Sequence, residues 1–503
     1  MRNSVLTYFE DTVSKLPDHI AVHDENRSIS FYELWTEAQN IAEIIVKEDC
    51  NKSPILVYLP KSVSSIAAFL GILYSGNFYT PTDINFPFEK VNSIMKQLEP
   101  IRILCNTNSY AFLKENGINE KKLINIDEYD LEKKITKPIG FAYTIDTDPV
   151  YTLFTSGSTG VPKGVTISNR SIIDYIDWAK DCYDVNESDK IGNQAPFYFD
   201  NSTLDIYLML STGATLYIIP EVCFAFPAKL IQYIADYKIN MVFWVPSVLI
   251  SVANMDLLSK VSGLSLSKIL FAGEVMPNKH LNYWRKHIPD ALYSNLYGPT
   301  EITVDCTYYI VDREFKDDEP LPIGVPCRNS DIIILDENDK MVQEAHKIGE
   351  LCVRGSSLAL GYWNAPEKTE EVFVQNPLNT HYPEKIYRTG DMVYYNECHE
   401  IIFSGRKDFQ IKHMGYRIEL GEIENAALGI KELENVCVCY DDNEKQIILF
   451  YTTQIALETR VIRKRLLESI PKYMVPTKYM QVDQFPMTAN GKIDRKEMFK
   501  LIK

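Results

Sequence analysis

The sequence predicts an α/β fold with a large domain of mainly parallel βα units and a small α+β domain after it. Strand-like and helix-like runs alternate along most of the chain, which is typical of parallel sheets. Near residue 400 the pattern changes to short strands flanked by helices, over a length typical of a small domain. We therefore expect a large domain over residues 1–404 and a small one over residues 405–503.

The alternation is clearest after the apolar run Val150–Phe154, which is expected to be a strand. Helical spacing of Ile172, Ile173, Ile176 and Trp178 predicts a helix over residues 169–183, with Ser168 or Asn169 as its N-cap. The next expected strands cover residues 214–220, 241–246 and 268–274. Expected helices cover 228–238, a segment from 247, and 278–288. In the small domain, strands are expected over 435–442 and 445–454.

Composition and charge exclude several classes of protein. The 503 residues carry a net charge of −16, from 52 Lys plus Arg against 68 Asp plus Glu. This balance disfavours a nucleic-acid binder and a protein that docks on an anionic membrane. The N-terminal segment has no apolar core of a secretory signal, and no apolar run approaches the ~20 residues that span a bilayer. Stable membrane insertion is therefore not expected.

The ten cysteines show no paired spacing typical of a disulfide framework or a zinc site. Cys437 and Cys439 are close together, and they are expected to share one face of a strand. Reduced thiols and a cytoplasmic location follow as expectations, with no structural metal site.

The run TSGSTGVPKG, residues 155–164, is read either as a flexible linker or as a loop that holds phosphate. It is not a Walker A motif, because Lys163 follows Pro162 rather than a glycine. An expected strand lies before it and a capped helix after it. Because backbone amides cradle phosphate in a strand–loop–helix setting, the sequence favours the phosphate interpretation.

Further motifs carry charge on turns. In NLYGPTE, residues 295–301, Glu301 follows a Gly-Pro turn and is suited to hold Mg²⁺ through a carboxylate oxygen. In YRTGD, Asp391 is suited to accept hydrogen bonds from ribose hydroxyls. GRKDFQIKHMGYRIELGEIE begins at Gly405, and NGKIDR places Lys492 on a turn near the C-terminal end. Each alone is an ordinary surface turn.

Together, and in this order, these motifs identify the chain as a member of the adenylate-forming superfamily. It resembles the amino-acid adenylation enzymes of nonribosomal peptide synthesis, and most of all the D-alanine–D-alanyl carrier protein ligase subgroup. The resemblance extends from ISFYELW at residue 29 to NGKIDRK at residue 490, and includes FDNS, FAGEVMP and GELCVRGSSLALGYWN. It implies a large adenylation domain and a small mobile C-terminal domain.

The resemblance implies two half-reactions that use ATP and Mg²⁺. A carboxylate attacks the α-phosphorus of ATP to give an acyl-AMP and pyrophosphate, and the phosphopantetheine thiol of a carrier protein then displaces AMP. The resemblance gives the ATP-binding positions as Thr155, Ser156, Gly157, Ser158, Thr159, Gly160, Lys163, Gly273, Glu274, Asn295, Leu296, Tyr297, Gly298, Pro299, Thr300, Asp391, Phe403, Arg406 and Lys492.

Within that set, the resemblance gives catalytic roles to Lys492, Thr300 and Glu301, with Glu301 as the metal ligand. Lys492 is expected to bridge the substrate carboxylate and the α-phosphate. The small domain is expected to rotate about a hinge at Asp408, whose alternative reading is a plain turn aspartate. This rotation is expected to bring Lys412 and Gly415 to the site for the thiol step.

By the same resemblance, Asp200 pairs with the α-ammonium of an amino acid. The substrate-binding positions are Asp200, Asn201, Leu204, Phe243, Leu270, Ala272, Leu296, Val304, Asp305 and Lys492. Four bulky apolar residues narrow the pocket and favour a substrate with a small side chain: Leu204, Phe243, Leu270 and Leu296. The D-alanine subgroup usually has Cys at the position of Ala272 and a hydrophobic residue at that of Asn201. D-alanine is the favoured substrate, and L-alanine, serine and β-amino acids stay open.

Because the chain ends eight residues after Arg495, the carrier protein is expected to be a separate partner. One alternative is an acyl-CoA synthetase or luciferase-like member of the superfamily, which Asp200 disfavours because fatty and aryl acids carry no ammonium. Another is an inactive nucleotide-binding scaffold, which the presence of Glu301, Asp391, Arg406 and Lys492 disfavours.

Overall fold

The structure, a computed structural model, describes residues 2–47, 51–141, 143–157, 161–442, 444–455, 457–486, 493 and 495–500. The described residues form two compact units. The large unit comprises Met1–Ile84, Leu98–Leu153 and Gly164–Lys407, and the small unit comprises Asn85–Gln97, Phe154–Lys163 and Asp408–Lys503. The chain thus passes from the large unit to the small unit between Lys407 and Asp408. The expected domain boundary after Ser404 stays a prediction.

The first sheet of the large unit has the strand order β15-β14-β13-β12-β11-β9-β10-β1-β2. Its central strands, from β13 to β1, pair in parallel, and the strands at both ends pair antiparallel. The strands are β1 (Ile20–His23), β2 (Ser28–Ser30), β9 (Lys190–Asn193), β10 (Thr215–Ile218), β11 (Met241–Trp244), β12 (Lys268–Phe271), β13 (Leu292–Tyr297), β14 (Thr307–Ile310) and β15 (Val325–Pro326). The expected strands at 214–220, 241–246 and 268–274 are confirmed.

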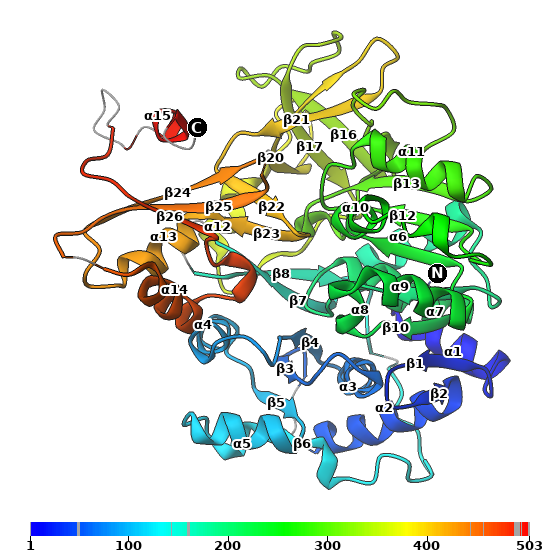
Figure 1. The fold of residues 1–503 in the computed structure, drawn as a ribbon. Coiled ribbons are helices and arrows are strands. Elements are labelled where there is room, and N and C mark those ends of the chain that lie inside the picture. Colours follow the sequence, from blue (N-terminus) through cyan, green and yellow to red (C-terminus); the bar gives the residue numbers. More distant parts are fainter. Residues whose placement is uncertain are drawn as a thin grey trace. The chain divides into compact units, whose positions relative to one another are not determined.

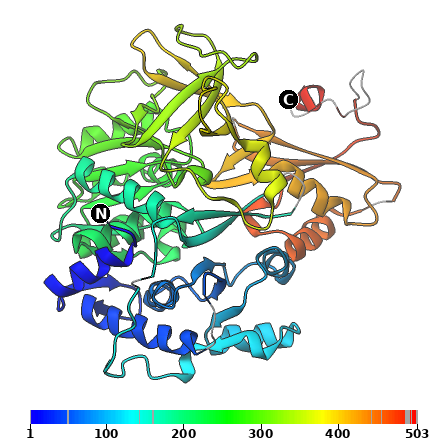
Figure 2. The same cartoon turned by 180° about the vertical axis from the view of Figure 1, so that it is seen from behind.

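The second sheet has the order β18-β8-β7-β4-β3-β5-β6, with parallel pairing from β7 to β6. Its strands are β3 (Pro54–Tyr58), β4 (Phe78–Pro81), β5 (Arg102–Cys105), β6 (Leu123–Asn125), β7 (Pro149–Thr155), β8 (Lys163–Ser168) and β18 (Gly361–Tyr362). Helices α2 and α3, drawn in blue, pack side by side in both views (Figures 1 and 2).

A third sheet has the order β16-β17-β20-β19, with β21 paired to β20, and all of these strand pairs are antiparallel. Its strands are β16 (Ser330–Leu335), β17 (Gly349–Gly355), β19 (Phe373–Gln375), β20 (Lys385–Tyr395) and β21 (Ile401–Arg406). This part of the large unit departs from the βα alternation expected there. Short connections such as residues 396–400, between β20 and β21, join antiparallel neighbours, whereas parallel strands need a long crossover.

The helices of the large unit are α1 (Leu6–Lys15), α2 (Phe31–Val46), α3 (Val63–Tyr74), α5 (Thr107–Glu115), α6 (Asn169–Tyr183), α7 (Asn201–Thr212), α8 (Glu221–Ala225), α9 (Pro227–Tyr237), α10 (Pro246–Asn254), α11 (Asn278–His287) and α12 (Pro366–Val372). Short 3-10 helices cover Glu120–Lys122, Ile126–Glu128, Leu258–Lys260 and Thr300–Ile302. The Ser168 hydroxyl accepts a hydrogen bond from the Ser171 amide, so Ser168, one of the two residues expected as N-cap, is the N-cap of α6.

The setting of the glycine-rich loop corrects one expectation. The loop joins β7 to β8, which are neighbours in the second sheet, and α6 begins only after β8. The predicted strand–loop–helix arrangement is therefore wrong, because residues 163–168 form a strand before the helix. The N-terminus of α6 does not directly follow this loop, so the expected contribution of its macrodipole to anion binding loses its basis.

The small unit has its own core. It contains a β22–β23 hairpin (Gln410–His413 and Tyr416–Glu419) and a sheet in the order β24-β25-β26 (Figure 1, orange and red). Its remaining elements are β24 (Asn435–Asp441), β25 (Gln446–Thr452), β26 (Lys478–Gln481), α13 (Leu420–Leu428), α14 (Thr459–Ser469), α15 (Arg495–Lys500), most of α4 (Phe88–Leu98) and the 3-10 helix Lys472–Met474. Cys437 and Cys439 lie in one buried cluster, on one face of β24 as expected.

Candidate active site

The parallel strands of the first sheet end side by side. Several predicted site residues therefore lie at the carboxyl-end edge of this sheet. Trp244 at the end of β11 pairs with Phe271 at the end of β12, and Phe271 pairs with Asn295 on β13. Ala272, Gly273 and Glu274 follow β12 directly. Ligands of open α/β sheets bind beyond the carboxyl ends of the strands, so this edge is the natural place for a site.

Three predicted pocket residues on the strands, Phe243, Leu270 and Leu296, share one face of this sheet. All the predicted apolar pocket residues belong to one large buried core cluster: Leu204, Phe243, Leu270, Ala272, Leu296 and Val304. Trp244 and Phe271, their neighbours along β11 and β12, belong to a different cluster. Because side chains alternate between the two faces of a strand, the sheet separates the predicted pocket lining from the second core.

Asp200 lies at the N-terminus of α7, where it is the N-cap residue. Burial, and the nearby charge of Asp200, raise the pKa of Tyr151 well above its usual range. Thr203, one turn into α7, donates a hydrogen bond to the Tyr151 hydroxyl over 3.2 Å. Asp200 therefore lies near Tyr151, an aromatic side chain that is almost completely buried.

Asn201 adds a polar group beside Asp200. Its amide nitrogen is buried and has no hydrogen-bond partner within the described part of the chain. A buried amide without a partner costs about 1–3 kcal/mol. A ligand group that accepts a hydrogen bond from this nitrogen would recover that cost.

Asp391 on β20 is the centre of a second cluster. The Arg406 guanidinium donates to one carboxylate oxygen over 2.6 Å, and the Tyr297 hydroxyl donates to the other. Arg406 also donates to the Thr389 carbonyl over 3.1 Å, and the Asp391 amide donates to the Thr389 hydroxyl. A carboxylate oxygen can accept more than one hydrogen bond, so this arrangement leaves acceptor capacity for ribose hydroxyls.

Two further predicted nucleotide residues lie at this cluster. The Phe403 ring, on β21, is tilted against the Tyr297 ring with centroids 6.4 Å apart. The Asn295 side chain donates to the Pro322 carbonyl over 2.8 Å. The structure therefore brings Asn295, Tyr297, Asp391, Phe403 and Arg406 together from strands that are distant in sequence.

The turn after β13, which carries Thr300 and Glu301, has a strained backbone at the two residues that follow Ile302. Thr303 and Val304 have φ of 62° and 69°, which is unfavourable for β-branched residues. Gly298 makes the turn possible, because a Cβ there would lie 2.3 Å from the Val304 carbonyl oxygen. Strain of this kind persists only where surrounding contacts fix the backbone, as at ligand-binding turns.

Contacts from the 355–362 segment fix this turn. Tyr362 donates to the fully buried Glu301 carboxylate over 2.8 Å, and the Ala359 amide donates to the Glu301 carbonyl. The Thr303 hydroxyl donates to the Ser357 carbonyl over 2.8 Å. Tyr362 was not predicted as a site residue, although it lies in the GYWN motif.

Two predicted residues have partners that the sequence did not reveal. Tyr175 on α6 donates a 2.7 Å hydrogen bond to the buried Asp305 carboxylate. Glu274 accepts a hydrogen bond from the Ser247 amide, in the first turn of α10. One oxygen of each carboxylate is thus occupied by the protein itself.

Part of the glycine-rich loop is described, in the small unit. The Thr155 hydroxyl is buried and has no hydrogen-bond partner among described residues. The Ser156 hydroxyl donates to the Arg417 carbonyl over 2.9 Å and accepts from the Glu419 amide over 3.2 Å. A Cβ on Gly157 would lie 2.0 Å from the Val161 carbonyl, and Lys163 begins β8. Ser158, Thr159 and Gly160 lie outside the described residues.

The remaining small-unit predictions are placed as follows. Lys492 lies outside the described residues. Asp408 is the first residue of the C-terminal part of the small unit, and its carboxylate accepts from the Gln410 amide over 3.2 Å. Lys412 lies on β22, and Gly415, with φ of 81°, lies between β22 and β23.

Residues 9–363 match the family described as AMP-binding enzyme, and residues 422–492 match the AMP-binding enzyme C-terminal domain. The chain belongs to the AMP-binding enzyme family. This family match confirms the resemblance found from the motifs.

Curated relatives match over nearly the whole chain. The D-alanine–D-alanyl carrier protein ligase of Staphylococcus haemolyticus is 32% identical over 503 residues, covering 98% of both chains. Zwittermicin A synthase ZmaJ of Bacillus cereus is 30% identical over 511 residues, covering 99% of this chain and 94% of the relative. Gramicidin S synthase 1 of Brevibacillus brevis is 31% identical, but the chain spans only 44% of its length.

Solved structures show the same fold. The Vibrio cholerae adenylation domain AlmE in complex with glycyl-adenosine-5'-phosphate has a TM-score of 0.84 at 20% identity, covering 100% of this chain and 98% of that one. The artificially fused adenylation–PCP di-domain NpsA-ThdA from Klebsiella oxytoca has a TM-score of 0.82 at 20% identity, covering 95% and 93%. The predicted α/β fold class is confirmed. Among the described helices, none has the length and apolar character needed to cross a membrane.

Proposed function

We propose that the protein activates a small amino acid, with D-alanine favoured, as an aminoacyl-AMP and transfers it to the phosphopantetheine thiol of a separate carrier protein. Family membership supports adenylate formation, and the full-length similarity to a D-alanine–D-alanyl carrier protein ligase supports the acceptor. The observation that carries the proposal is the position of Asp200 at the N-terminus of α7, where its charge helps to raise the pKa of the buried Tyr151. A carboxylate there suits the ammonium of an amino acid with a short side chain.

In the first half-reaction, a substrate carboxylate oxygen bonds to the α-phosphorus of ATP while the bond to the β-phosphate oxygen breaks. Asp391 and Arg406 hold the ribose, Asn295 and Tyr297 face the adenine, and Thr300 reaches the α-phosphate. Thr155, with its buried hydroxyl lacking a described partner, suits a phosphate oxygen. Positioning and charge stabilisation supply the catalysis, because the attacking and leaving groups are both anionic.

The residues present fit a Mg²⁺ ion that arrives with ATP. Among the described residues, no group of three His, Cys, Asp or Glu side chains is arranged to hold a metal. Mg²⁺ commonly binds through one or two carboxylates together with substrate phosphates, and the Tyr362-oriented Glu301 offers such a carboxylate. When bound, the ion would neutralise phosphate charge. Glu301 would hold it, while Lys492, carried by the small unit, would bridge the two anions.

In the second half-reaction, the carrier thiolate attacks the acyl carbon, a thioester forms, and AMP leaves with the electron pair of the broken C–O bond. We propose that the small domain turns about Asp408 between the half-reactions and presents Lys412 and Gly415. The change of compact unit between Lys407 and Asp408 supports a hinge at this point.

A second candidate substrate is serine, which the Asn201 amide favours. A serine hydroxyl can accept a hydrogen bond from the buried Asn201 nitrogen, whereas an alanine methyl cannot. Ala272 also leaves more room than the cysteine usual in the D-alanine subgroup. L-alanine and β-alanine remain comparison substrates because they change only stereochemistry or chain length.

Amino-acid-dependent exchange of labelled pyrophosphate into ATP tests the proposal. The panel contains D- and L-alanine, D- and L-serine, β-alanine, propionate and a longer fatty acid. We expect exchange with one small amino acid and none with the simple acids. Exchange with propionate or the fatty acid instead would support an acyl-CoA synthetase, and no exchange with any of them would support an inactive scaffold.

A further inference from the structure

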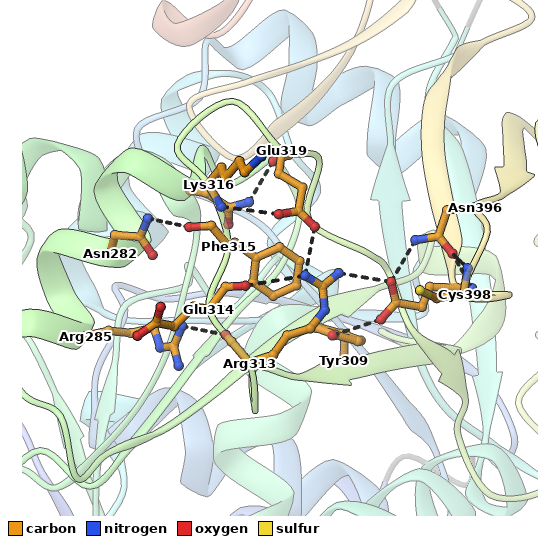
Figure 3. A network of polar contacts seen from close by, with 12 residues as sticks. Asn282, Arg285, Tyr309, Arg313, Glu314, Phe315, Lys316, Glu319, Asn396 and Cys398 are labelled. Carbon is orange, nitrogen blue, oxygen red and sulfur yellow. Dashed lines mark hydrogen bonds and ion pairs between the residues drawn. The ribbon is translucent and has the colours of Figure 1, made fainter.

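Arg313, in the loop after β14, is the centre of a polar network outside the predicted site (Figure 3). Its guanidinium donates to Glu319 over 2.8 Å and to Glu400 over 3.2 Å. The same group lies 3.7 Å from the centre of the Phe315 ring. One side chain thus joins the 312–322 loop to the turn between β20 and β21.

Further hydrogen bonds fix both ends of this network. Tyr309 on β14 donates to Glu400 over 3.0 Å, and Asn396 donates to Glu400 over 2.7 Å. The Arg285 side chain donates to the Arg313 carbonyl over 2.7 Å (Figure 3). Hydrogen bonds from Asn396, Tyr309 and Arg313 outweigh the effect of burial and lower the pKa of Glu400, so Glu400 is ionised at neutral pH.

The network continues by two short routes into the nucleotide cluster, by which we mean Asn295, Tyr297, Asp391, Phe403 and Arg406. The first is the loop itself, because it ends at Pro322, whose carbonyl accepts the hydrogen bond from Asn295. The second is β21, which starts one residue after Glu400 and carries Phe403 and Arg406. The two routes meet where the Ile323 amide donates to the Ile401 carbonyl over 2.9 Å.

Gly324 closes this arrangement tightly. Its φ is 82°, and a Cβ there would lie 1.9 Å from the Tyr308 carbonyl oxygen. The end of the loop therefore has little freedom to shift against β14. Tyr309, the next residue of β14, is the register partner of Asn295 and also the donor to Glu400.

We propose that Arg313 is a positioning residue for the nucleotide, which fixes the Asn295 and β21 sides of the ATP site relative to each other. This inference rests on the proposed function, since the nucleotide roles of Asn295, Phe403 and Arg406 belong to that proposal. The contacts of Arg313 described above are with protein groups, so its proposed role is one of positioning rather than of catalysis. It acts through the Pro322 carbonyl and through the start of β21.

Because the side chains of this network are partly exposed, its effect on positioning can be tested with little effect on folding stability. The Arg313 side chain is 38% exposed, and its partners Glu319 and Glu400 are 33% and 18% exposed. Exposed ion pairs contribute only about 0–1 kcal/mol to folding stability. The planar guanidinium, however, reaches two carboxylates and an aromatic ring at once, which a lysine ammonium cannot do with the same geometry.

Arg354 provides a matched control in the same unit. It is also 38% exposed and also pairs with two carboxylates, those of Asp331 and Glu384. Its strand, β17, carries none of the predicted nucleotide residues. Arg354→Lys therefore removes a comparable surface pair without touching the routes to Asn295 and β21.

The experiment compares the wild type, Arg313→Lys and Arg354→Lys by calorimetric titration with MgATP and by exchange kinetics. For Arg313→Lys we expect about tenfold weaker MgATP binding and an equally raised KM for ATP. The reason is that a small displacement of the Asn295 and β21 sides of the proposed site weakens their contacts with the nucleotide. We expect kcat and the KM for the amino acid to change less than about threefold, and Arg354→Lys to match the wild type. Both variants should have similar thermal midpoints.

The positioning role would be overturned if both variants lost MgATP affinity equally, or if neither variant lost any. A rise in the amino-acid KM as large as that for ATP would also overturn it, because the network would then support the unit generally. The wild-type titration separates the two claims. If the wild type binds MgATP and Arg313→Lys binds it equally well, the inference fails alone; if the wild type does not bind, the proposed function fails with it.

Discussion

The cluster around Asp391, which we propose binds the nucleotide, and the α7 region around Asp200 differ in how their buried polar groups are hydrogen-bonded. Asp391 meets the Arg406 guanidinium and the Tyr297 hydroxyl, which come from separate strands. On α7, Asp205 is completely buried, accepts from the Asn193 amide over 2.8 Å, and has a second oxygen without a described partner. The Asn201 amide is also without a described partner.

Under the proposed function, these two parts of one unit would receive different ligands. Around Asp391, the protein supplies a cation and hydrogen bonds before any ligand binds, so the carboxylate is preorganised. Around α7, polar atoms are buried before they are fully satisfied, which costs stability that a ligand or a proton can recover. The nucleotide side is thus expected to depend on its protein partners, and the amino-acid side on its ligand.

The largest expected effect is on the amino-acid side. Asp200→Asn leaves the substrate ammonium without a counter-charge, and breaking a buried ion pair costs about 3–5 kcal/mol. We expect amino-acid-dependent pyrophosphate exchange to fall about a thousandfold, while calorimetric binding of MgATP stays within about twofold of the wild type. Retained exchange would show that the substrate has no α-ammonium at this position.

The second prediction tests the nucleotide side. Asp391→Asn keeps a side chain of the same size but removes the charge that faces Arg406 at 2.6 Å. We expect kcat/KM for ATP to fall about a hundredfold with little change in the KM for the amino acid, since truncating a buried charge pair costs several kcal/mol. An equal rise in both KM values would break the distinction between the two regions.

The third prediction concerns the wall of the amino-acid pocket. Ala272 is buried directly after β12. If it lines the amino-acid pocket, as we propose, a larger side chain there reduces the space for the substrate. We expect Ala272→Cys to raise the ratio of kcat/KM for D-alanine over L-alanine about tenfold and to lower activity on serine, because one extra group in a pocket changes selectivity by ~1–3 kcal/mol. An unchanged ratio would mean that residue 272 does not line the substrate.

The smallest effect is on stability. Burial raises the pKa of Asp205 to about 7, against the opposing effects of the Asn193 hydrogen bond and the charge of Lys61. Between about pH 4 and pH 7 the native state therefore binds more protons than the unfolded state, and stability falls as pH rises. We expect Asp205→Asn, which has no charge to bury, to lose less stability over this range.

Thermal unfolding of the wild type and Asp205→Asn at pH 5 and pH 7.5 measures this effect. The variant's thermal midpoint relative to the wild type should be about 2–4 °C higher at pH 7.5 than at pH 5, for roughly 2–3 kcal/mol of relief in a large unit. The same relative midpoint at both pH values would mean that Asp205 stays ionised throughout and that its buried charge is compensated.

Local patterns in the sequence determined much of the fold. The apolar spacing of Ile172, Ile173, Ile176 and Trp178 fixed α6, and Ser168 fixed its start. Alternation of strands and helices predicted the parallel centre of the first sheet, because parallel neighbours need a helical crossover. The identities of the charged residues in the turns also came from sequence, but their roles came from a family resemblance rather than from periodicity.

The tertiary structure alone decided which distant residues meet. Tyr175 holds Asp305 from 130 residues away, Tyr362 holds Glu301 from 61, and Arg313 joins Glu400 across 87. It also placed β8 between the glycine-rich loop and α6, where the sequence had suggested a direct entry into the helix. Helical and strand periods report only neighbours along the chain. Contacts between separate elements depend on how sheets pack and which strands pair, and that is set by the whole fold.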